Sequence, residues 1–400
     1  MMEKYDIAIA GAGISGLSLA HFCVKAGLNT LVLEKADRAG GCFHSHEFDG
    51  DAAGFWIELG AHSCYNSYAR LIGILEDRGL INRLLPREKV PFRILAEGKL
   101  VSIPSRLDFL ELIFSLPRIL TSKKEGSSME SYYSGILGKK NYSRVLGPVF
   151  NAIISQDASG FPADALFKKR AKRKDILSSY TFTKGLQTVT DELSSGQGLK
   201  VLLGREVESI EFSDDVFITT AGGSRYESRF AAVASPPPSA SKVLSGSFPE
   251  LSAHLSKIIS GTVETVGVAI QKDETPVPPV AGIIAADDIF LSAVSRDVVK
   301  DDRFRGFAFH FRPGRAGRDE KLARIATVLK VKPEQLTRVA YKDDNSVPSL
   351  AVGHSRWVSE ADRLVAGSPL LLAGNYFSGV AIEDCVVRSY EESERLKKTL

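Results

Sequence analysis

The chain has 400 residues, of which 44% are hydrophobic and 25% are charged, and this is the composition of an ordinary globular protein. Its formal net charge is only +3, which argues against nucleic acid as the main partner. The length predicts two or three domains, and the four cysteines show neither CxxC nor metal-ligand spacing. We therefore expect a reducing compartment and no bound metal.

The first residues carry the most informative pattern. An apolar run over 5–10 enters Gly11-Ala12-Gly13-Ile14-Ser15-Gly16, a helical pattern follows, and a second apolar run over 30–33 ends at Glu34 and Lys35. Strand, glycine turn, helix, strand and acid in this order predict a dinucleotide-binding βαβ unit. Glu34 follows Gly11 by 23 residues, the spacing expected of an acid that accepts hydrogen bonds from a ribose.

A glycine doublet follows the acid and favours FAD over NAD. Gly40-Gly41, followed by Cys42, lets a loop pass close to a pyrophosphate or ribityl chain. Gly60 and Ala61 are small enough for a flat isoalloxazine ring to lie against their backbone, and His62 comes next. Each segment taken alone also fits an ordinary turn.

The N-terminal segment shows no export signal. Residues 7–24 carry no formal charge, but their glycines and strand–turn–helix order argue against a membrane span. The opening Met1-Met2-Glu3-Lys4 lacks the basic region of a signal peptide. We therefore expect a cytoplasmic protein, with peripheral contact at the inner face of a membrane left open.

Residues 66–180 are predicted to be mostly helical. An amphipathic helix is expected over 68–79, and a more apolar one over 107–120, with basic residues on its flanks. The latter is too short to span a bilayer. It fits either a helix in the membrane interface or, as we favour, a buried helix pair that lines an apolar cavity. The basic cluster over 168–174 fits a solvated face, an anionic membrane contact or steering of an acidic substrate.

The second half of the chain alternates in the manner of β-strands. Strands are expected over 200–203, 207–210, 216–220, 230–234, 263–270, 307–311 and 369–373. A proline run over 236–238 should end one strand and mark a crossing between domains. A helix is expected over 383–396.

Three segments closely resemble the protoporphyrinogen oxidase family, within the superfamily of amine oxidases and phytoene desaturases. Residues 372–385 read LAGNYFSGVAIEDC, which is similar to that family's C-terminal flavin motif. Residues 179–187 read SYTFTKGLQ, and residues 347–354 read VPSLAVGH. These segments resemble the family's mid-chain segment and the segment upstream of its flavin motif.

The resemblance implies an α/β fold with a Rossmann-like, GR2-type FAD-binding domain and a discontinuous α+β substrate domain. The FAD-binding domain would comprise 1–65, 181–235 and 366–400. Residues 66–180 would form a helical, substrate- or membrane-facing insertion, and 236–365 the substrate-binding domain. Non-covalent FAD would contact Val207 on its adenine side, and its flavin end would lie against the two small-residue segments. Besides those named above, the residues implied at the cofactor are Gly374, Asn375, Gly379, Val380 and Ile382.

The implied reaction is porphyrinogen oxidation in heme biosynthesis. Hydride would pass from protoporphyrinogen IX or coproporphyrinogen III to flavin N5, and oxygen or another acceptor would reoxidise the flavin. Such a flavoenzyme needs no catalytic triad. The candidates for substrate contact are His62, beside the flavin segment, and Arg93, whose cation could pair with a propionate.

Departures from the family pattern leave the substrate open. Cys42 stands where many relatives have arginine, and Glu58 stands where aspartate is common. A second interpretation is therefore a desaturase or amine oxidase that acts on another apolar substrate such as an isoprenoid. A third is a non-redox flavoprotein, for example an isomerase of the UDP-galactopyranose mutase type.

Overall fold

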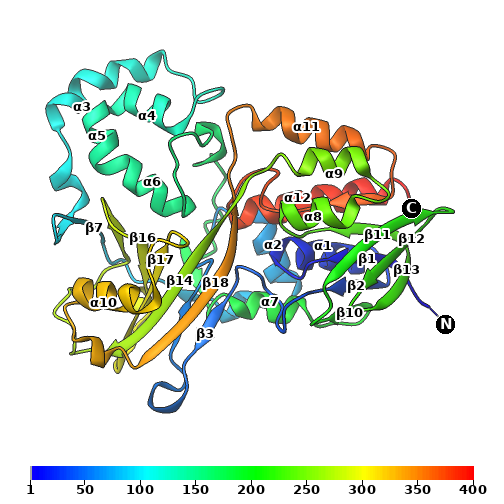
Figure 1. Ribbon diagram of the computed structural model, residues 1–400, viewed down its shortest axis with the longest axis horizontal. Helices are drawn as coiled ribbons and strands as arrows, with labels where there is room; N and C mark the ends of the chain where they lie inside the picture. The colour runs from blue at the N-terminus through cyan, green and yellow to red at the C-terminus, as the bar shows by residue number, and fades with distance from the viewer. Residues whose placement is uncertain (1) are drawn as a thin grey trace.

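The computed structural model of residues 2–400 is organised by two seven-stranded sheets (Figure 1). The first has the strand order β10-β2-β1-β13-β12-β11, and β19 pairs with the later half of β13. The strands β10, β2, β1, β13 and β19 are parallel, as the βαβ pattern predicts. The strands are β1 (Glu3–Ala10), β2 (Thr30–Leu33), β10 (Leu199–Leu202), β11 (Val207–Ser213), β12 (Val216–Ala221), β13 (Ser224–Val233) and β19 (Leu370–Leu372).

Helices cover both faces of this sheet because alternate strand residues are apolar on both sides. Phe230 and Ala232 of β13 join one core with α1 (Ile14–Lys25), α2 (Ala69–Asp77), α7 (Gln187–Leu193) and α12 (Ile382–Lys397). Ala231 and Val233 join the opposite core with α8 (Pro237–Leu244), α9 (Pro249–Leu255) and α11 (His354–Val365). Continuous apolar strands of this kind are typical of parallel sheets buried on both faces.

The second sheet has the order β18-β14-β17-β16-β15-β7-β8 and packs against α10 (Arg318–Leu329). Its other face meets the short β3–β4 hairpin of the flavin segment through Phe55, Ile57 and Leu59. The two units are therefore joined by an apolar contact. The strands are β3 (Ser45–Glu47), β4 (Trp56–Glu58), β7 (Phe92–Ala96), β8 (Lys99–Ser102), β14 (Ser260–Gln271), β15 (Gly282–Ala285), β16 (Phe290–Ser295), β17 (Phe304–Phe311) and β18 (Arg338–Pro348).

The proline run ends β13 as predicted, but the domain crossing expected there is wrong. Pro237 starts α8, because proline fits the first turn of a helix. Helices α8 and α9 then stay on the first sheet, packed with Phe217 of β12. The chain reaches the second sheet only at β14.

A group of short helices stands above the second sheet (Figure 1). They are α3 (Phe109–Ser115), α4 (Met129–Leu137), α5 (Lys139–Asn141) and α6 (Gly147–Ile154), with a 3₁₀ turn η4 (Leu116–Leu120) after α3. Our preference for a buried helix over 107–120 is wrong, since Phe114 is 78% exposed and Leu120 is 88% exposed. Apolar composition alone does not distinguish a core-facing helix from one whose partner lies outside the chain. Among residues 2–400, no helix is both long and apolar enough to cross a bilayer.

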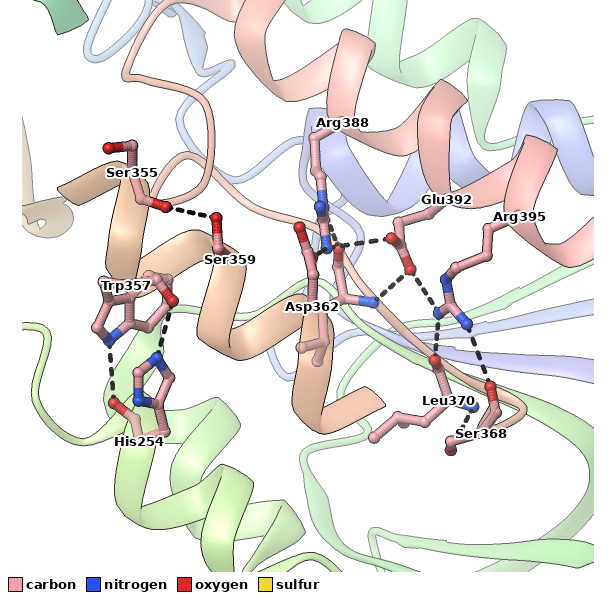
Figure 2. A network of polar contacts seen from close by, with 11 residues as sticks. His254, Ser355, Trp357, Ser359, Asp362, Ser368, Leu370, Arg388, Glu392 and Arg395 are labelled. Carbon is pink, nitrogen blue, oxygen red and sulfur yellow. Dashed lines mark hydrogen bonds and ion pairs between the residues drawn. The ribbon is translucent and has the colours of Figure 1, made fainter. Parts of the chain in front are cut away.

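Polar side chains of α12 fix the end of the first sheet (Figure 2). Arg388 donates to the carbonyl of Leu372 at 2.9 Å and pairs with Glu392 at 3.0 Å and with Asp362 of α11 at 2.8 Å. Glu392 in turn accepts from the Leu372 N–H at 3.1 Å and pairs with Arg395 at 2.8 Å. Both backbone groups of Leu372 are therefore satisfied by helix side chains rather than by another strand.

Candidate cofactor and active site

The glycine-rich turn lies where β1 meets α1. Gly11 has a φ of +106°, which L side chains rarely adopt. A Cβ on Gly16 would lie 1.9 Å from the carbonyl oxygen of Gly11, so only glycine lets α1 lie this close to β1. A Cβ on Gly13 would meet no protein atom within 4 Å, and no side chain caps the N-terminus of α1. At Ile14 and Ser15 the helix therefore begins with N–H groups that are available to an anion.

Glu34 stands at the end of β2 beside this turn. Its carboxylate accepts hydrogen bonds from the N–H groups of Ala12 at 2.8 Å and Ala36 at 3.0 Å. Each oxygen keeps a lone pair that can accept from a ribose hydroxyl. The backbone N–H of Arg205 donates to the Glu34 carbonyl at 2.7 Å, which brings Val207 to the same edge of the sheet. Lys35 is exposed there.

The glycine doublet lies directly against the glycine-rich turn. Gly40 donates its N–H to the carbonyl of Ala12 at 2.8 Å, and Gly40 forms a parallel bridge with Gly13. Arg38, which sequence reasoning did not single out, donates to the carbonyl of Gly41 at 2.7 Å. It also bonds the carbonyl of Phe43 at 2.8 Å, so its side chain holds the loop in shape.

The loop continues to the small-residue segment expected at the flavin. Ala61 donates its N–H to the carbonyl of Cys42 at 2.7 Å, and a Cβ on Gly60 would lie 2.2 Å from that oxygen. Cys42 is solvent-accessible although protein surrounds it and raises the pKa of its thiol by desolvation.

The C-terminal motif meets the N-terminal one. Ser389 of α12 donates its hydroxyl to the carbonyl of Ser15 at 2.7 Å. Gly374 and Gly379 have φ values of +153° and +140°, which glycine readily adopts, and the latter makes room for the carboxylate of Asp384. Asn375 and Val380 each follow one of these glycines and are half-buried, and Ile382 begins α12.

Part of the basic cluster also belongs to this region. Lys168 and Arg170 pair with buried Asp384 at 3.0 and 2.7 Å, and Lys168 also donates to the carbonyl of Ser378. The interpretation of 168–174 as a solvated face is therefore wrong for these two residues. Sequence reasoning missed the pairing because Asp384 lies more than 200 positions away.

On the side toward the second sheet, the flavin segment lines a cavity with mixed polarity. His62 shares a hydrogen bond of 2.8 Å with Ser63, and burial next to the Arg87 cation lowers its pKa to about 3. Glu58 lies in the same wall, where desolvation raises its pKa to about 7 against hydrogen bonds from the Leu186 N–H and the Ser45 hydroxyl. Arg93, on β7, does not line this cavity.

These features fit FAD. The cradle for it is the set formed by the open space at Gly13, the uncapped helix, the Glu34 carboxylate and the accessible Cys42. Among the described residues, no three His, Cys, Asp or Glu side chains gather to share a metal ion.

Comparison with known proteins agrees with this geometry. Residues 14–281 match the family described as flavin containing amine oxidoreductase. The chain belongs to this family. It is therefore an FAD-dependent oxidoreductase, and the resemblance drawn from its motifs is confirmed.

Its relatives include porphyrinogen oxidases. The enzyme is 24% identical to chloroplastic protoporphyrinogen oxidase of Nicotiana tabacum over 97% of this chain and 84% of that protein. It is 24% identical to coproporphyrinogen III oxidase of Staphylococcus aureus over 44% of this chain and 41% of that protein. The structure of a candidate protoporphyrinogen oxidase from Exiguobacterium shares its fold, with a TM-score of 0.80, 17% identity and coverage of 100% and 99% of the two chains.

Proposed function

We propose that this FAD-dependent oxidoreductase oxidises a porphyrinogen. The observation that carries the proposal is the similarity to tobacco protoporphyrinogen oxidase along nearly the whole chain. The similarity to a coproporphyrinogen III oxidase favours the same substrate class. Other relatives are 15-cis-phytoene desaturases, which keep the isoprenoid alternative as the competing outcome of the test.

We propose that FAD lies in the cradle described above. Its pyrophosphate would rest on Gly11, Gly13 and Gly16, a ribose on Glu34, the adenine side near Val207, and the ring against Gly60 and Ala61. When bound, FAD supplies a two-electron acceptor for hydride. The chain's own contribution is to place the reacting carbon beside that acceptor and to exclude water. His62 stays neutral at physiological pH, so it can position a substrate by hydrogen bonding but does not act as a charged acid.

Anaerobic mixing tests the reaction. The purified holoenzyme would be mixed with protoporphyrinogen IX or coproporphyrinogen III while flavin absorbance and porphyrin fluorescence are followed. We expect one of them to bleach the flavin as porphyrin fluorescence appears, which would also name the substrate. Flavin that stays oxidised with both would refute the proposal. Bleaching by an isoprenoid would then indicate the desaturase alternative.

We also propose that the enzyme attaches to an anionic membrane through α3 and η4. Large apolar side chains are exposed there in one run, namely Phe109, Leu110, Ile113, Phe114, Leu116, Ile119 and Leu120. Exposed Arg118 and Lys123 flank them and complement anionic headgroups. Phe167, 56% exposed, extends the apolar surface near Lys124.

Vesicle sedimentation tests the attachment. We expect binding to phosphatidylglycerol vesicles, weaker binding to phosphatidylcholine vesicles, and a loss of about 100-fold in the variant F114S/L120S. Two side chains that leave water on binding contribute about 3 kcal/mol, and each 1.4 kcal/mol is tenfold. The control is Ile259→Ser, which removes a similarly exposed side chain that belongs to neither α3 nor η4. Equal loss in the control, or self-association without lipid, would contradict the proposal.

A further inference from the structure

The cavity beside His62 holds two guanidinium groups that have no acidic partner among the described residues. Arg87 precedes β7, and Arg296 follows β16, and both line the cavity together with Trp56 and Thr181. No carboxylate lies within 4 Å of either cation in the described chain. Both arginines are half-buried, and a guanidinium that is partly withdrawn from water is normally paired, so the arrangement leaves a place for an anion.

Arg296 is held in place without being neutralised. Its guanidinium lies 4.2 Å from the centre of the Trp56 ring, and one nitrogen donates to the carbonyl of Val299 at 2.6 Å. Its Nε is buried without a hydrogen-bond partner. Burial lowers the pKa of Arg296 to about 10, which leaves it charged at physiological pH. The side chain is therefore positioned for a ligand rather than for a protein carboxylate.

Arg87 lies on the side of the cavity where Ser63 and His62 lie. It donates to the Ser63 hydroxyl at 2.5 Å, and Ser63 in turn contacts His62. Its Nε is also buried without a partner, as is the hydroxyl of Thr181, a residue that is only 3% exposed. Three buried polar atoms from separate segments thus lack partners around one small space.

The acids nearby do not neutralise these cations. Glu58 lines the cavity, but its oxygens accept from the Leu186 N–H and the Ser45 hydroxyl, and its pKa is raised toward neutrality. Asp297, next to Arg296, is paired with Arg305 at 2.5 Å. Asp301, whose charge also acts on Arg296, forms no ion pair with it and accepts from the Arg303 N–H at 2.9 Å. The cavity therefore carries excess positive charge.

We propose that this cavity binds a carboxylate group through Arg87 and Arg296. Guanidinium groups match carboxylates in geometry and bond them more strongly than neutral acceptors. The cavity is small, about 20 Å³, so the carboxylate head group would enter it while the aliphatic stem that carries it would remain outside. The bearer of that carboxylate rests on the proposed function, in which a porphyrinogen propionate would occupy the site instead of pairing with Arg93.

Titration of the holoenzyme with sodium propionate tests the site directly. Trp56 lies under Arg296, so occupancy should change tryptophan fluorescence in a saturable way, and neutral propionamide should not. We expect Arg296→Gln and Arg87→Gln each to weaken propionate binding at least tenfold, with Arg296→Lys intermediate. Arg318→Gln is the matched control, because Arg318 also lies on an aromatic ring, 4.5 Å from Tyr341, but outside the cavity.

The outcomes separate this proposal from the porphyrinogen proposal. Saturable propionate binding that depends on both arginines supports the site even if no porphyrinogen is oxidised. A response that is non-saturable, equal for propionamide or unchanged in folded Arg87→Gln and Arg296→Gln overturns it, even if porphyrinogen is oxidised. If oxidation occurs, both variants should raise KM for the free acid more than for its dimethyl ester, with little change in kcat.

Discussion

Alanine substitutions at two glycines of the same turn, Gly13 and Gly16, should have different effects: the first on binding of FAD and the second on folding stability. A Cβ on Gly13 enters open space, whereas a Cβ on Gly16 would lie 1.9 Å from a backbone oxygen. Gly13→Ala therefore changes the apoprotein only through the weaker N-cap, about 1 kcal/mol. Gly16→Ala forces α1 away from β1, and overpacking of this kind costs about 3 kcal/mol or more.

The effect of Gly13→Ala on the cofactor should be larger than its effect on folding. If the pyrophosphate rests on this residue, the added methyl group removes one or two charge-assisted hydrogen bonds, each about 1.5–3 kcal/mol. Affinity for FAD should then fall about 100-fold. Flavin titration of the apoprotein measures affinity, and urea unfolding of the same apoprotein measures stability.

Gly73→Ala is the matched control. Gly73 lies within α2, where a Cβ would also meet no protein atom within 4 Å, and alanine there should stabilise the helix by about 1 kcal/mol without changing FAD affinity. If Gly13→Ala binds FAD as the parent enzyme does, the proposed cradle is wrong. If Gly13→Ala and Gly16→Ala unfold alike, the packing argument is wrong.

Three further outcomes follow from buried charged and thiol groups. The pKa of Glu58 in the folded enzyme, about 7, lies above its value of 4.5 in the unfolded chain. The free energy of unfolding should therefore decrease by about 3 kcal/mol as pH rises from about 4.5 to 7. Unfolding measured across this pH range should lose that slope in Glu58→Gln. Arg388→Met should lower the free energy of unfolding in urea by about 3–5 kcal/mol, because it leaves buried Glu392 with one cation fewer. The control Arg363→Met, which removes one member of an exposed ion pair, should lower it by less than about 0.5 kcal/mol. Acid precipitation should release all the flavin into the supernatant. Cys385 is buried with its pKa raised to about 12, so it does not supply a thiolate for a covalent bond to the flavin. Flavin retained in the pellet would contradict this expectation.

The sequence alone predicted the elements whose residue pattern lies within one short segment. The segment from Tyr5 to Glu34 shows its strand, turn and helix within thirty residues, and the structure places β1, α1 and β2 there. The exposure of α3 was not readable, because a run such as Phe109–Leu120 has the same composition whether it meets a core or a membrane. Whether such a helix is buried depends on whether another part of the fold packs against it, and the composition of the helix does not show this.

The cavity beside His62 was equally beyond sequence reasoning. Arg87 and Arg296 belong to no motif, and more than 200 residues separate them. The parallel pairing of β15 with β7, in the register Gly282 to Phe92, carries the two segments together. A contact of this kind depends on the register of distant strands, which a single sequence does not reveal.

The first sheet also constrains the order in which the enzyme can mature during synthesis. Its strands come from three separate stretches of the chain, and β19 and α12 emerge from the ribosome after every other element of the sheet. Until then, the edge of β13 beside Ala232 lacks its partner, and Ser15 lacks the hydroxyl of Ser389. The FAD-binding sheet is therefore complete only after β19 and α12 have been synthesised, and until then the nascent chain carries an unpaired apolar edge of the kind that favours aggregation.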